Sequence, residues 1–256
     1  MTESPWQVVL VTGAASGIGA ACARRFAQDN ALVFCADREW DGVQALVAEI
    51  GASHARALRL DVTDEDSWNA AMREVQGTGV ALTTLVHAAG ISAGSPLRET
   101  SLVEWRRVMA VNLDGAFLAT RHGVEAMHAT GGAIVLLGSA SGIRPAVGAL
   151  AYSTSKSAVA MLARGAAKEC LANGIPVRVN VVSPGGVKTS MWRTMPFFID
   201  LVEKQGSEDA AFAALAGTGP AFATAEEIAA VVHFVASPAA SQLTGAELAA
   251  DGGYVL

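Results

Sequence analysis

The sequence predicts one α/β domain in which a doubly wound parallel sheet of seven strands is covered by helices on both faces. The chain has 256 residues, which is enough for a single domain with a large core. Short β-branched runs alternate with longer helical patterns, and this order implies right-handed crossovers between parallel strands. Several strand runs are apolar on both faces, as strands buried from both sides must be.

The expected strands recur along the whole chain, and the expected helices lie between them. The strands are predicted at Gln7–Thr12, Ala31–Ala36, Ala55–Leu60, Thr83–Ala88, Ala133–Leu137, Pro176–Val182 and Ala246–Ala250. The helices are predicted at Gly17–Gln28, Trp40–Ile50, Asp64–Gln76, Leu102–His128, Tyr152–Ala172 and Ala225–Ala236. Ser101 with Glu104, and Thr224 with Glu227, have the spacing of capping boxes that open two of these helices.

One stretch, from Ser190 to Pro220, is predicted to be irregular. It carries Met191, Trp192, Phe197 and Phe198 and is too apolar for a disordered linker. We expect this stretch to form a mobile lid over an apolar ligand. The alternative is a buried helical excursion without a role in binding.

Composition excludes several classes of protein. The net charge of −6 and the pI near 5.4 argue against nucleic-acid binding. The five histidines have no metal-ligand spacing, and Cys22, Cys35 and Cys170 are expected to be core residues in a reducing compartment. Met1–Trp6 lacks the regions of a signal peptide, and no apolar run is long enough to span a bilayer. We therefore expect a cytoplasmic protein with no metal, nucleic-acid or membrane partner.

Residues 12–19 read Thr-Gly-Ala-Ala-Ser-Gly-Ile-Gly between the first expected strand and the first expected helix. Glycines let the backbone turn sharply and approach a bulky anion without an intervening Cβ. The helix N-terminus then offers free N–H groups and partial positive charge to a pyrophosphate. The spacing differs from G-x-G-x-x-G and from a P-loop, so a purely structural turn is the alternative.

Asp37 ends the second expected strand, about twenty residues beyond the glycines, where a carboxylate can bind an adenosine ribose. A 2′-phosphate there would meet like charge, which favours NAD over NADP. Arg38 could instead receive that phosphate, and Asp37 could instead cap a helix. Asp61 and Val62, after the third strand, could hold the adenine edge, or Asp61 could cap a turn.

Tyr152 and Lys156 lie four residues apart, which places them on one face of a helix, one turn apart. An ammonium beside a phenol favours the phenolate, so we expect the pKa of Tyr152 to be lowered. Such a tyrosine can exchange a proton with an alcohol or a carbonyl group. The pair alone is also common on solvated helix faces.

Taken together, these motifs resemble the short-chain dehydrogenase/reductase family over Val8 to Gly253. The matching features are the 12–19 turn, Asn112 in V-N-L-D-G-A-F, Ser139 in G-S-A-S-G, Tyr152 with Lys156, Ser183-Pro184-Gly185 with Thr189, and the ending L-T-G-A-E-L-A-A-D-G-G. The resemblance implies a Rossmann-type single domain over residues 1–256. Its cofactor-binding portion would span about 7–140, and its catalytic and substrate-binding portion about 139–256, with the mobile loop at about 190–220.

The resemblance also implies roles for individual residues. Tyr152 would be the general acid/base, Lys156 would lower its pKa and hold the nicotinamide ribose, and Ser139 would steady the substrate oxygen. Asn112 would hold a water that links Lys156 to solvent, and it is expected to disturb regular helix hydrogen bonding. The expected cofactor-binding residues are Gly13, Ser16, Gly17, Ile18, Gly19, Asp37, Arg38, Asp61, Val62, Ala88, Ala89, Gly90, Val111, Tyr152, Lys156, Pro184, Gly185, Val187 and Thr189.

One departure from the family pattern follows the fourth strand. The family usually has Asn-Asn-Ala-Gly, whereas this chain has His87-Ala88-Ala89-Gly90, so both asparagine side chains are replaced. Gly90 keeps the room that a cofactor ribose would need. His87 is expected to be a partly buried residue at the strand end, and a catalytic base is the alternative.

The implied activity is an NAD-dependent interconversion of a secondary alcohol and a ketone. The aromatic segment after Ser190 suggests an apolar cyclic or aromatic, steroid-like substrate. The alternatives are an NADPH-dependent carbonyl or 3-oxoacyl-carrier-protein reductase, and a non-catalytic NAD-binding regulator. The family commonly forms tetramers through the helices that correspond to Leu102–His128 and Tyr152–Ala172, so a homotetramer is expected.

Overall fold

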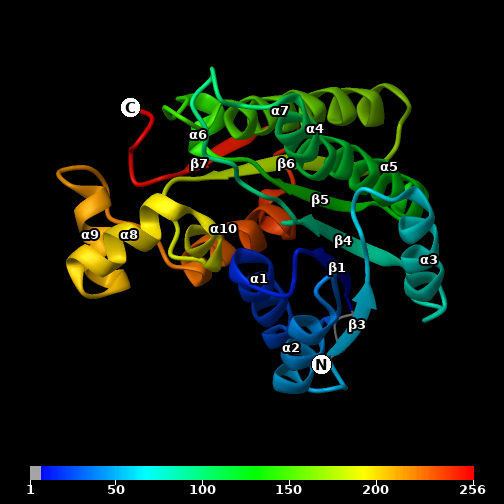
Figure 1. Cartoon of the computed structure of the whole chain (residues 1–256). Coiled ribbons are helices and arrows are strands. Elements are labelled where there is room, and N and C mark those ends of the chain that lie inside the picture. Colours follow the sequence, from blue (N-terminus) through cyan, green and yellow to red (C-terminus); the bar gives the residue numbers. More distant parts are fainter. Residues whose placement is uncertain (1–6) are drawn as a thin grey trace.

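A parallel sheet of seven strands crosses the centre of the molecule in the computed structural model, which describes residues 7–256 (Figure 1). The strands are β1 (Val8–Thr12), β2 (Leu32–Asp37), β3 (Ala55–Arg59), β4 (Leu82–His87), β5 (Gly132–Leu137), β6 (Val177–Pro184) and β7 (Glu247–Ala250). Their order is β3-β2-β1-β4-β5-β6-β7, and every neighbouring pair is parallel. The predicted sheet is confirmed. The expectation for Met1–Trp6 lies outside the described residues.

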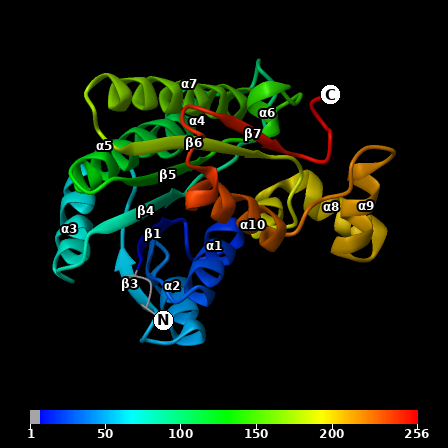
Figure 2. The same ribbon diagram turned by 180° about the vertical axis from the view of Figure 1, so that it is seen from behind.

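Helices cover the two faces of the sheet as separate layers (Figures 1 and 2). One layer holds α1 (Gly17–Gln28), α2 (Trp40–Ile50) and α10 (Ala225–Ala236). The other holds α3 (Glu65–Gln76), α4 (Leu102–Met109), α5 (Gly115–Met127) and α7 (Leu150–Ala172). Because side chains alternate along each strand, Leu10 and Leu85 belong to one apolar core and Val11 and Val86 to the other. Both faces of the central strands are therefore buried.

The single helix predicted over Leu102–His128 is broken into α4 and α5 by a π-helical turn, Ala110–Asp114. Asn112 lies in this turn, where it is buried. Its side-chain amide accepts a hydrogen bond from Ile91 N–H and donates one to the Ile91 carbonyl. The expected disturbance of helix hydrogen bonding at Asn112 is thus confirmed. A π turn accommodates one extra residue, and such turns are frequent at functional sites.

One of the two predicted capping boxes is complete. The Thr224 hydroxyl accepts from Glu227 N–H, and the Glu227 carboxylate accepts from Thr224 N–H, at the start of α10. At the start of α4 the Ser101 hydroxyl accepts from Glu104 N–H. The second half of that box was predicted wrongly, because the Glu104 carboxylate accepts from the Ser95 hydroxyl instead.

The stretch predicted as irregular, Ser190 to Pro220, is largely helical, so that prediction was wrong. A 3₁₀ turn, η2 (Ser190–Thr194), precedes α8 (Pro196–Gln205) and α9 (Glu208–Ala216). These helices pack against each other and not onto the sheet, and Phe198, Leu201 and Val202 of α8 face this packing at helical spacing. Their own small core contains Phe198, Ala211 and Phe212, packed against Trp192 and Phe222.

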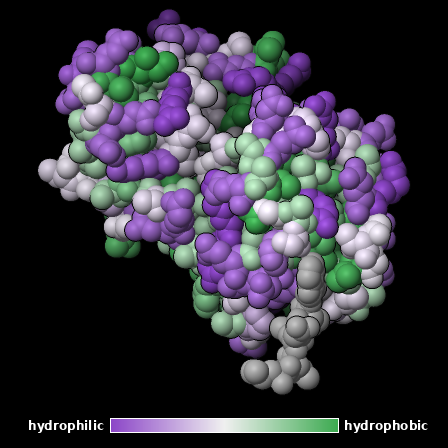
Figure 3. Space-filling view, turned by 90° about the horizontal axis from the view of Figure 1, so that it is seen from below, coloured by the Kyte–Doolittle hydropathy of each residue, from purple (hydrophilic) through white to green (hydrophobic). Residues whose placement is uncertain are grey.

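Two short elements complete the described chain, α6 (Ala140–Ile143) and η3 (Pro238–Ala240). Cys22, Cys35 and Cys170 are buried and free, which confirms their expected place in the core. Within residues 7–256, no helix combines the length and apolarity that a membrane crossing needs, and no cluster of side chains could hold a metal ion. The face shown in Figure 3 mixes hydrophilic residues with small apolar groups.

Candidate active site

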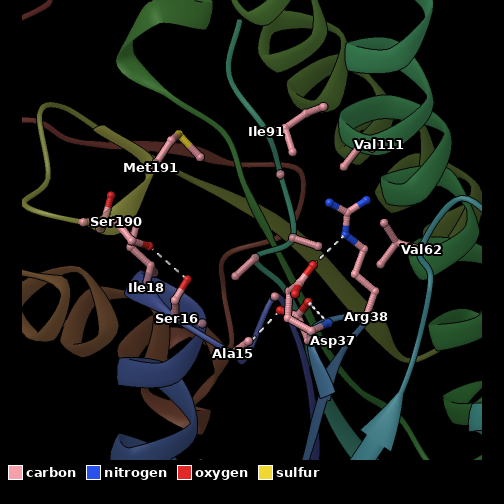
Figure 4. A pocket seen from close by; sticks show the side chains of 18 of the residues that line it. Ala15, Ser16, Ile18, Asp37, Arg38, Val62, Ile91, Val111, Ser190 and Met191 are labelled. Carbon is pink, nitrogen blue, oxygen red and sulfur yellow. Dashed lines mark hydrogen bonds and ion pairs between the residues drawn. The ribbon is translucent and has the colours of Figure 1, made fainter. Parts of the chain in front are cut away.

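A groove of about 270 Å³ opens at the carboxyl ends of β1 and β4. At this place in the sheet the strand order reverses direction, and α/β proteins bind ligands outside such a point. Figure 4 shows side chains from the β1–α1 turn, the end of β2, the π turn and the start of η2 around one hollow. The lining residues are Gly13, Ala15, Ser16, Gly17, Ile18, Gly19, Asp37, Arg38, Glu39, Leu60, Asp61, Val62, Ala88, Ala89, Gly90, Ile91, Val111, Thr189, Ser190 and Met191.

The β1–α1 turn has no room for side chains at its glycines. Gly13 has φ +69°, and a Cβ there would lie 2.6 Å from Ala89 N on the neighbouring strand end. Gly17 has φ +55°, and Ser16 at the N-cap of α1 makes no side-chain capping bond. The first N–H groups of α1 are therefore left for a ligand, and no acidic residue occupies that first turn. These features fit the pyrophosphate of a dinucleotide.

Backbone N–H groups fix the Asp37 carboxylate at the far side of this groove. One of its oxygens accepts from Ala15 N–H and the other from Glu39 N–H, each at 3.1 Å (Figure 4). The neighbouring Arg38 guanidinium pairs with the Glu39 carboxylate at 3.4 Å. Hydrogen bonds from Thr63 lower the pKa of Asp61. The groove thus presents a carboxylate, that of Asp37, whose position is fixed by backbone N–H groups.

Ser139, Tyr152 and Lys156 meet beside the groove. Ser139 follows β5 and is the N-cap of α6, where its hydroxyl accepts from Ser141 N–H at 3.1 Å. Tyr152 and Lys156 lie on one side of α7, with Lys156 Nζ 5.8 Å from the centre of the Tyr152 ring. The Ser139 hydroxyl also lies close enough to the Tyr152 phenol to favour its charged form and so to oppose the rise of its pKa. The predicted juxtaposition of the phenol and the ammonium is therefore present.

Burial dominates the acidity of this pair. Desolvation lowers the pKa of Lys156 to about 8, and Nζ donates to the Leu137 carbonyl at 2.8 Å. Desolvation raises the pKa of Tyr152 above its ordinary value, and the nearby Ser139 hydroxyl opposes this only in part. The lowered pKa predicted for Tyr152 is thus not produced by the protein groups alone.

Asn112 and Gly90 join these catalytic candidates to the groove. The Asn112 carbonyl oxygen accepts from Ile91 N–H, and its NH₂ group donates to Ile91 O and to Ser155 Oγ. Both amide N–H groups are therefore committed to positioning the chain. A Cβ on Gly90 would lie 3.3 Å from Lys156 Nζ and 3.4 Å from Asn112 Oδ1, so glycine keeps the groove open to the lysine.

Most of the predicted cofactor-binding residues line the groove, but Tyr152, Lys156, Pro184, Gly185 and Val187 do not. Pro184 and Val187 are buried, and the Val187 carbonyl accepts from the Trp192 indole. The expectation missed six lining residues, which are Ala15, Glu39, Leu60, Ile91, Ser190 and Met191. All of them except Met191 directly adjoin residues that were predicted. The Ser190 hydroxyl donates to Ser16 Oγ at 3.2 Å, a contact between residues far apart in sequence (Figure 4).

His87 ends β4 on the same sheet face as α7 and is 2% exposed. Its Nδ1 lies 2.9 Å from Thr12 Oγ1. Burial, with a smaller effect of the Lys156 charge, lowers the pKa of His87 to about 3. It is therefore a neutral residue at the strand end, as expected, but it is fully buried where partial burial was expected, and its lowered pKa disfavours the alternative of a catalytic base.

Comparison with known proteins gives one consistent result. A sequence profile described as short chain dehydrogenase matches residues 7–196. The chain is 42% identical to a galactitol 2-dehydrogenase (L-tagatose-forming) of Cereibacter sphaeroides, over 96% of this chain and 94% of that protein. It is 40% identical to a cis-4-hydroxycyclohexanecarboxylate dehydrogenase of Sinomonas cyclohexanicum, with 97% and 96% covered.

A solved structure agrees with these sequence relatives. The 3-ketoacyl-(acyl-carrier-protein) reductase of Brucella melitensis, in complex with NADH, superposes with a TM-score of 0.84 at 26% identity. The match covers 98% of both chains.

Proposed function

The chain belongs to the short-chain dehydrogenase family, and we propose that it interconverts a secondary alcohol and a ketone with NAD(H). The observation that carries this proposal is the meeting of Ser139, Tyr152 and Lys156 beside a groove with a dinucleotide-like phosphate turn. Intact acid/base groups at that place argue against a non-catalytic regulator.

The residues around the groove divide the work. The 13–19 turn and α1 would hold the pyrophosphate, Asp37 the adenosine ribose, and Lys156 the nicotinamide ribose. When bound, the nicotinamide supplies the carbon that accepts or donates hydride. Tyr152 removes the proton of the alcohol during oxidation and returns it to the ketone oxygen during reduction. Ser139 donates a hydrogen bond to the substrate oxygen as its charge develops.

The pKa of the Tyr152 phenol must be low enough for the tyrosine to lose and regain its proton near neutral pH. Burial raises the pKa of Tyr152, so the protein needs further positive charge close to the phenol. The Lys156 ammonium and the charged nicotinamide ring of the oxidised cofactor are the two sources that this site would offer. We therefore expect the acid/base chemistry to depend on a loaded groove.

NAD is the proposed cofactor because the Asp37 carboxylate is held in place by two N–H groups and would repel a 2′-phosphate. Glu39 supports the same preference, because it adds a second negative charge and pairs with the Arg38 guanidinium. Replacing Asp37 by alanine should lower the ratio of kcat/KM with NAD to that with NADP at least tenfold. An unchanged ratio would remove Asp37 from this role.

The substrate is proposed to be a small alicyclic or polyhydroxylated secondary alcohol. The names of the relatives include a galactitol dehydrogenase and a hydroxycyclohexanecarboxylate dehydrogenase. Two of the three aromatic residues that suggested a steroid-like substrate, Trp192 and Phe198, are used elsewhere, since they pack against each other and against Phe212. The third, Phe197, is half exposed. A panel of cyclic alcohols and polyols, followed by NADH absorbance, tests this proposal.

The decisive variant is Tyr152→Phe. Loss of the phenolic hydroxyl should reduce kcat by about 10²- to 10⁴-fold, while NADH binding measured by fluorescence stays nearly unchanged. Near-normal turnover in this variant would end the assignment of Tyr152. NADH binding without turnover of any alcohol by the unaltered protein would favour the regulator.

A cytoplasmic homotetramer is the proposed assembly. Val103 on α4, Phe117 on α5, and Met161 and Leu171 on α7 are exposed although they are large and apolar. Contact between copies of this chain would cover them. Light scattering should give four times the mass of one 26.2 kDa chain. Buried free thiols in the described chain suit a reducing compartment.

A further inference from the structure

The imidazole of His87 is bonded at one end only. Nδ1 lies 2.9 Å from Thr12 Oγ1, whereas Nε2 has no hydrogen-bond partner among residues 7–256. The side chain is 2% exposed, so bulk water does not reach it. A buried polar atom without a partner gives up its hydrogen bonds to water and gains none in the protein, which is unfavourable for a residue with only a packing role.

Lys156 is a buried charged residue on this side of the sheet. His87 pairs in register with Thr12 on β1 and with Leu136 on β5, and Lys156 Nζ donates to the next carbonyl of β5, Leu137 O, at 2.8 Å. The Lys156 charge acts on His87 strongly enough to lower its pKa. Because Nδ1 is turned to β1, Nε2 is the nitrogen left without a protein partner on this side of the sheet.

The surroundings also fix which nitrogen carries the proton. Burial keeps His87 neutral, so one nitrogen holds a proton and the other a lone pair. Beside an ammonium, the lone pair is favoured at Nε2 and the proton at Nδ1. Nδ1–H then donates to Thr12 Oγ1, which also accepts from Ala89 N–H at 3.3 Å.

We propose that His87 is a positioning residue for Lys156, its Nε2 accepting a hydrogen bond from the Lys156 ammonium through one buried water. This inference rests on the proposed function, in which Lys156 holds the cofactor ribose. The ammonium has three N–H donors. One N–H donates to Leu137 O and a second donates to the water bonded to His87, so the third N–H is directed toward the groove.

The other groups around Lys156 carry bonds of their own. Within residues 7–256, Tyr152 is the one other titratable side chain shown to face the lysine, and it lies one turn earlier on α7 with its ring centre 5.8 Å from Nζ. Asn112 in the π turn is neutral, its oxygen already accepts from Ile91 N–H, and its NH₂ group donates to Ile91 and Ser155. Gly90 has no side chain. A bridging water with His87 would therefore stabilise the charged form of Lys156.

Two substitutions separate the two nitrogens of His87. Asparagine places its amide where Nδ1 lies, so His87→Asn keeps a bond to Thr12 but loses the acceptor toward Lys156. Glutamine reaches the position of Nε2, so His87→Gln keeps that acceptor. His128→Asn, at an exposed histidine after α5, is the matched control. The three variants should fold, and thermal unfolding checks this.

The readout is the pH dependence of the unfolding free energy, which needs no cofactor. The unfolding free energy of the unaltered protein, taken as its difference from that of Lys156→Met, should rise with pH from about pH 8, the pKa of folded Lys156. Taking the difference removes the opposite effect of Cys22, Cys35 and Cys170, whose pKa values are raised by burial and which lower the free energy above about pH 9 in both proteins. In His87→Asn, measured against the same variant carrying Lys156→Met, the rise should begin about one pH unit lower, because the ammonium has lost an acceptor. His87→Gln and His128→Asn should match the unaltered protein. The alkaline limb of kcat/KM should move by the same amount in His87→Asn alone.

A rise that begins at the same pH in all His87 variants would overturn the proposal, as would the absence of any Lys156-dependent rise. If His87→Asn only lowered the melting temperature, His87 would have a packing role. Failure of the unaltered protein to bind NADH or to oxidise any alcohol would end the proposed function, yet the unfolding experiment would still decide the link between His87 and Lys156.

Discussion

The groove at the end of β1 and β4 and the α8–α9 segment are stabilised in different ways. The groove is built from backbone, since its glycine turn touches the neighbouring strand end and Asp37 is held by two N–H groups. The α8–α9 segment is built from side chains, namely a cluster of aromatic rings and two exposed ion pairs, Lys188–Asp209 and Arg193–Glu208. It projects from one end of the sheet (Figure 1).

This difference indicates which part of the molecule can move. Opening the groove would break the packing of the central strands, so its shape is fixed by the global stability of the fold. The α8–α9 segment has its own small core and could open as a unit while the sheet stays intact. Ser190 and Met191 belong to both regions, because they line the groove and begin the segment. Movement of α8–α9 would therefore change the positions of Ser190 and Met191 in the wall of the groove.

The largest effect is expected where backbone touches backbone. Gly13→Ala would place a methyl group 2.6 Å from Ala89 N at a φ of +69°, so the turn must move away from β4. We expect NADH binding and turnover to be lost and the unfolding free energy to fall by about 2–4 kcal/mol. Gly165→Ala is the control, because no atom lies within 4 Å of its Cβ on α7. Equal behaviour of the two variants would contradict a backbone-built groove.

Disrupting the aromatic cluster should unfold α8 and α9 while the central sheet stays folded. Phe212→Ala removes a ring that packs on Phe198 and Phe222 at centroid distances of 4.8 and 5.0 Å, at a cost of about 3–5 kcal/mol. Hydrogen exchange should speed up in α8 and α9 and stay slow in β1 and β4. Phe197→Ala, at a ring that is half exposed, should do much less. Faster exchange throughout the sheet would show that the segment is not an independent unit.

The pH dependence of stability tests the buried charge beside the groove, that of Lys156. The ordinary pKa of lysine is 10.5 and that of folded Lys156 about 8, so between these values the unfolded chain binds a proton that the folded chain does not. Relative to Lys156→Met, the unfolding free energy should therefore rise with pH over this window, by up to about 3 kcal/mol. The comparison with Lys156→Met is needed because burial raises the pKa values of Cys22, Cys35 and Cys170, and these thiols lower the free energy of both proteins above about pH 9. Tyr152, whose pKa is also raised, acts in the same direction as the thiols above about pH 10. An equal pH dependence in the two proteins would show that the pKa of folded Lys156 is not lowered.

The smallest effect is expected at the exposed ion pairs. Arg193 bonds both oxygens of Glu208, but both side chains are solvated, so Arg193→Gln should change the melting temperature by less than about 4 °C. The difference should shrink in high salt. A larger, salt-independent loss would mean that these charges, and not the rings, hold the segment.

The central sheet was predictable because its strands are short apolar runs buried on both faces. Each strand end differs from the prediction by at most two residues. The cofactor groove followed from the same pattern, since glycines and a carboxylate at strand ends must meet at one edge of a parallel sheet. Tyr152 and Lys156 were predictable because helical spacing alone places them together.

The rest depends on contacts that a linear pattern does not contain. Ser190 reaches Ser16 only because η2 folds back over the turn. Regular structure in α8 and α9 was missed because these helices pack on each other, although the αL residue Gly206 and the capping Ser207 between them are sequence signals of a helix end and a helix start. The acidity of Tyr152 was predicted from its neighbour, whereas burial proved to be the larger effect.

The π turn at Ala110–Asp114 sets the rotational phase of everything that follows it in α5. In a regular α-helix each residue advances the side chains by about 100° around the axis. The one extra residue in this turn therefore lets α4 and α5 keep nearly one axis while presenting differently directed faces to the sheet. It is what turns Ala116 and Ala119 inward and brings Asn112 to the backbone at Ile91. A chain one residue shorter at this point would keep a helix here but point the wrong side of α5 at the core.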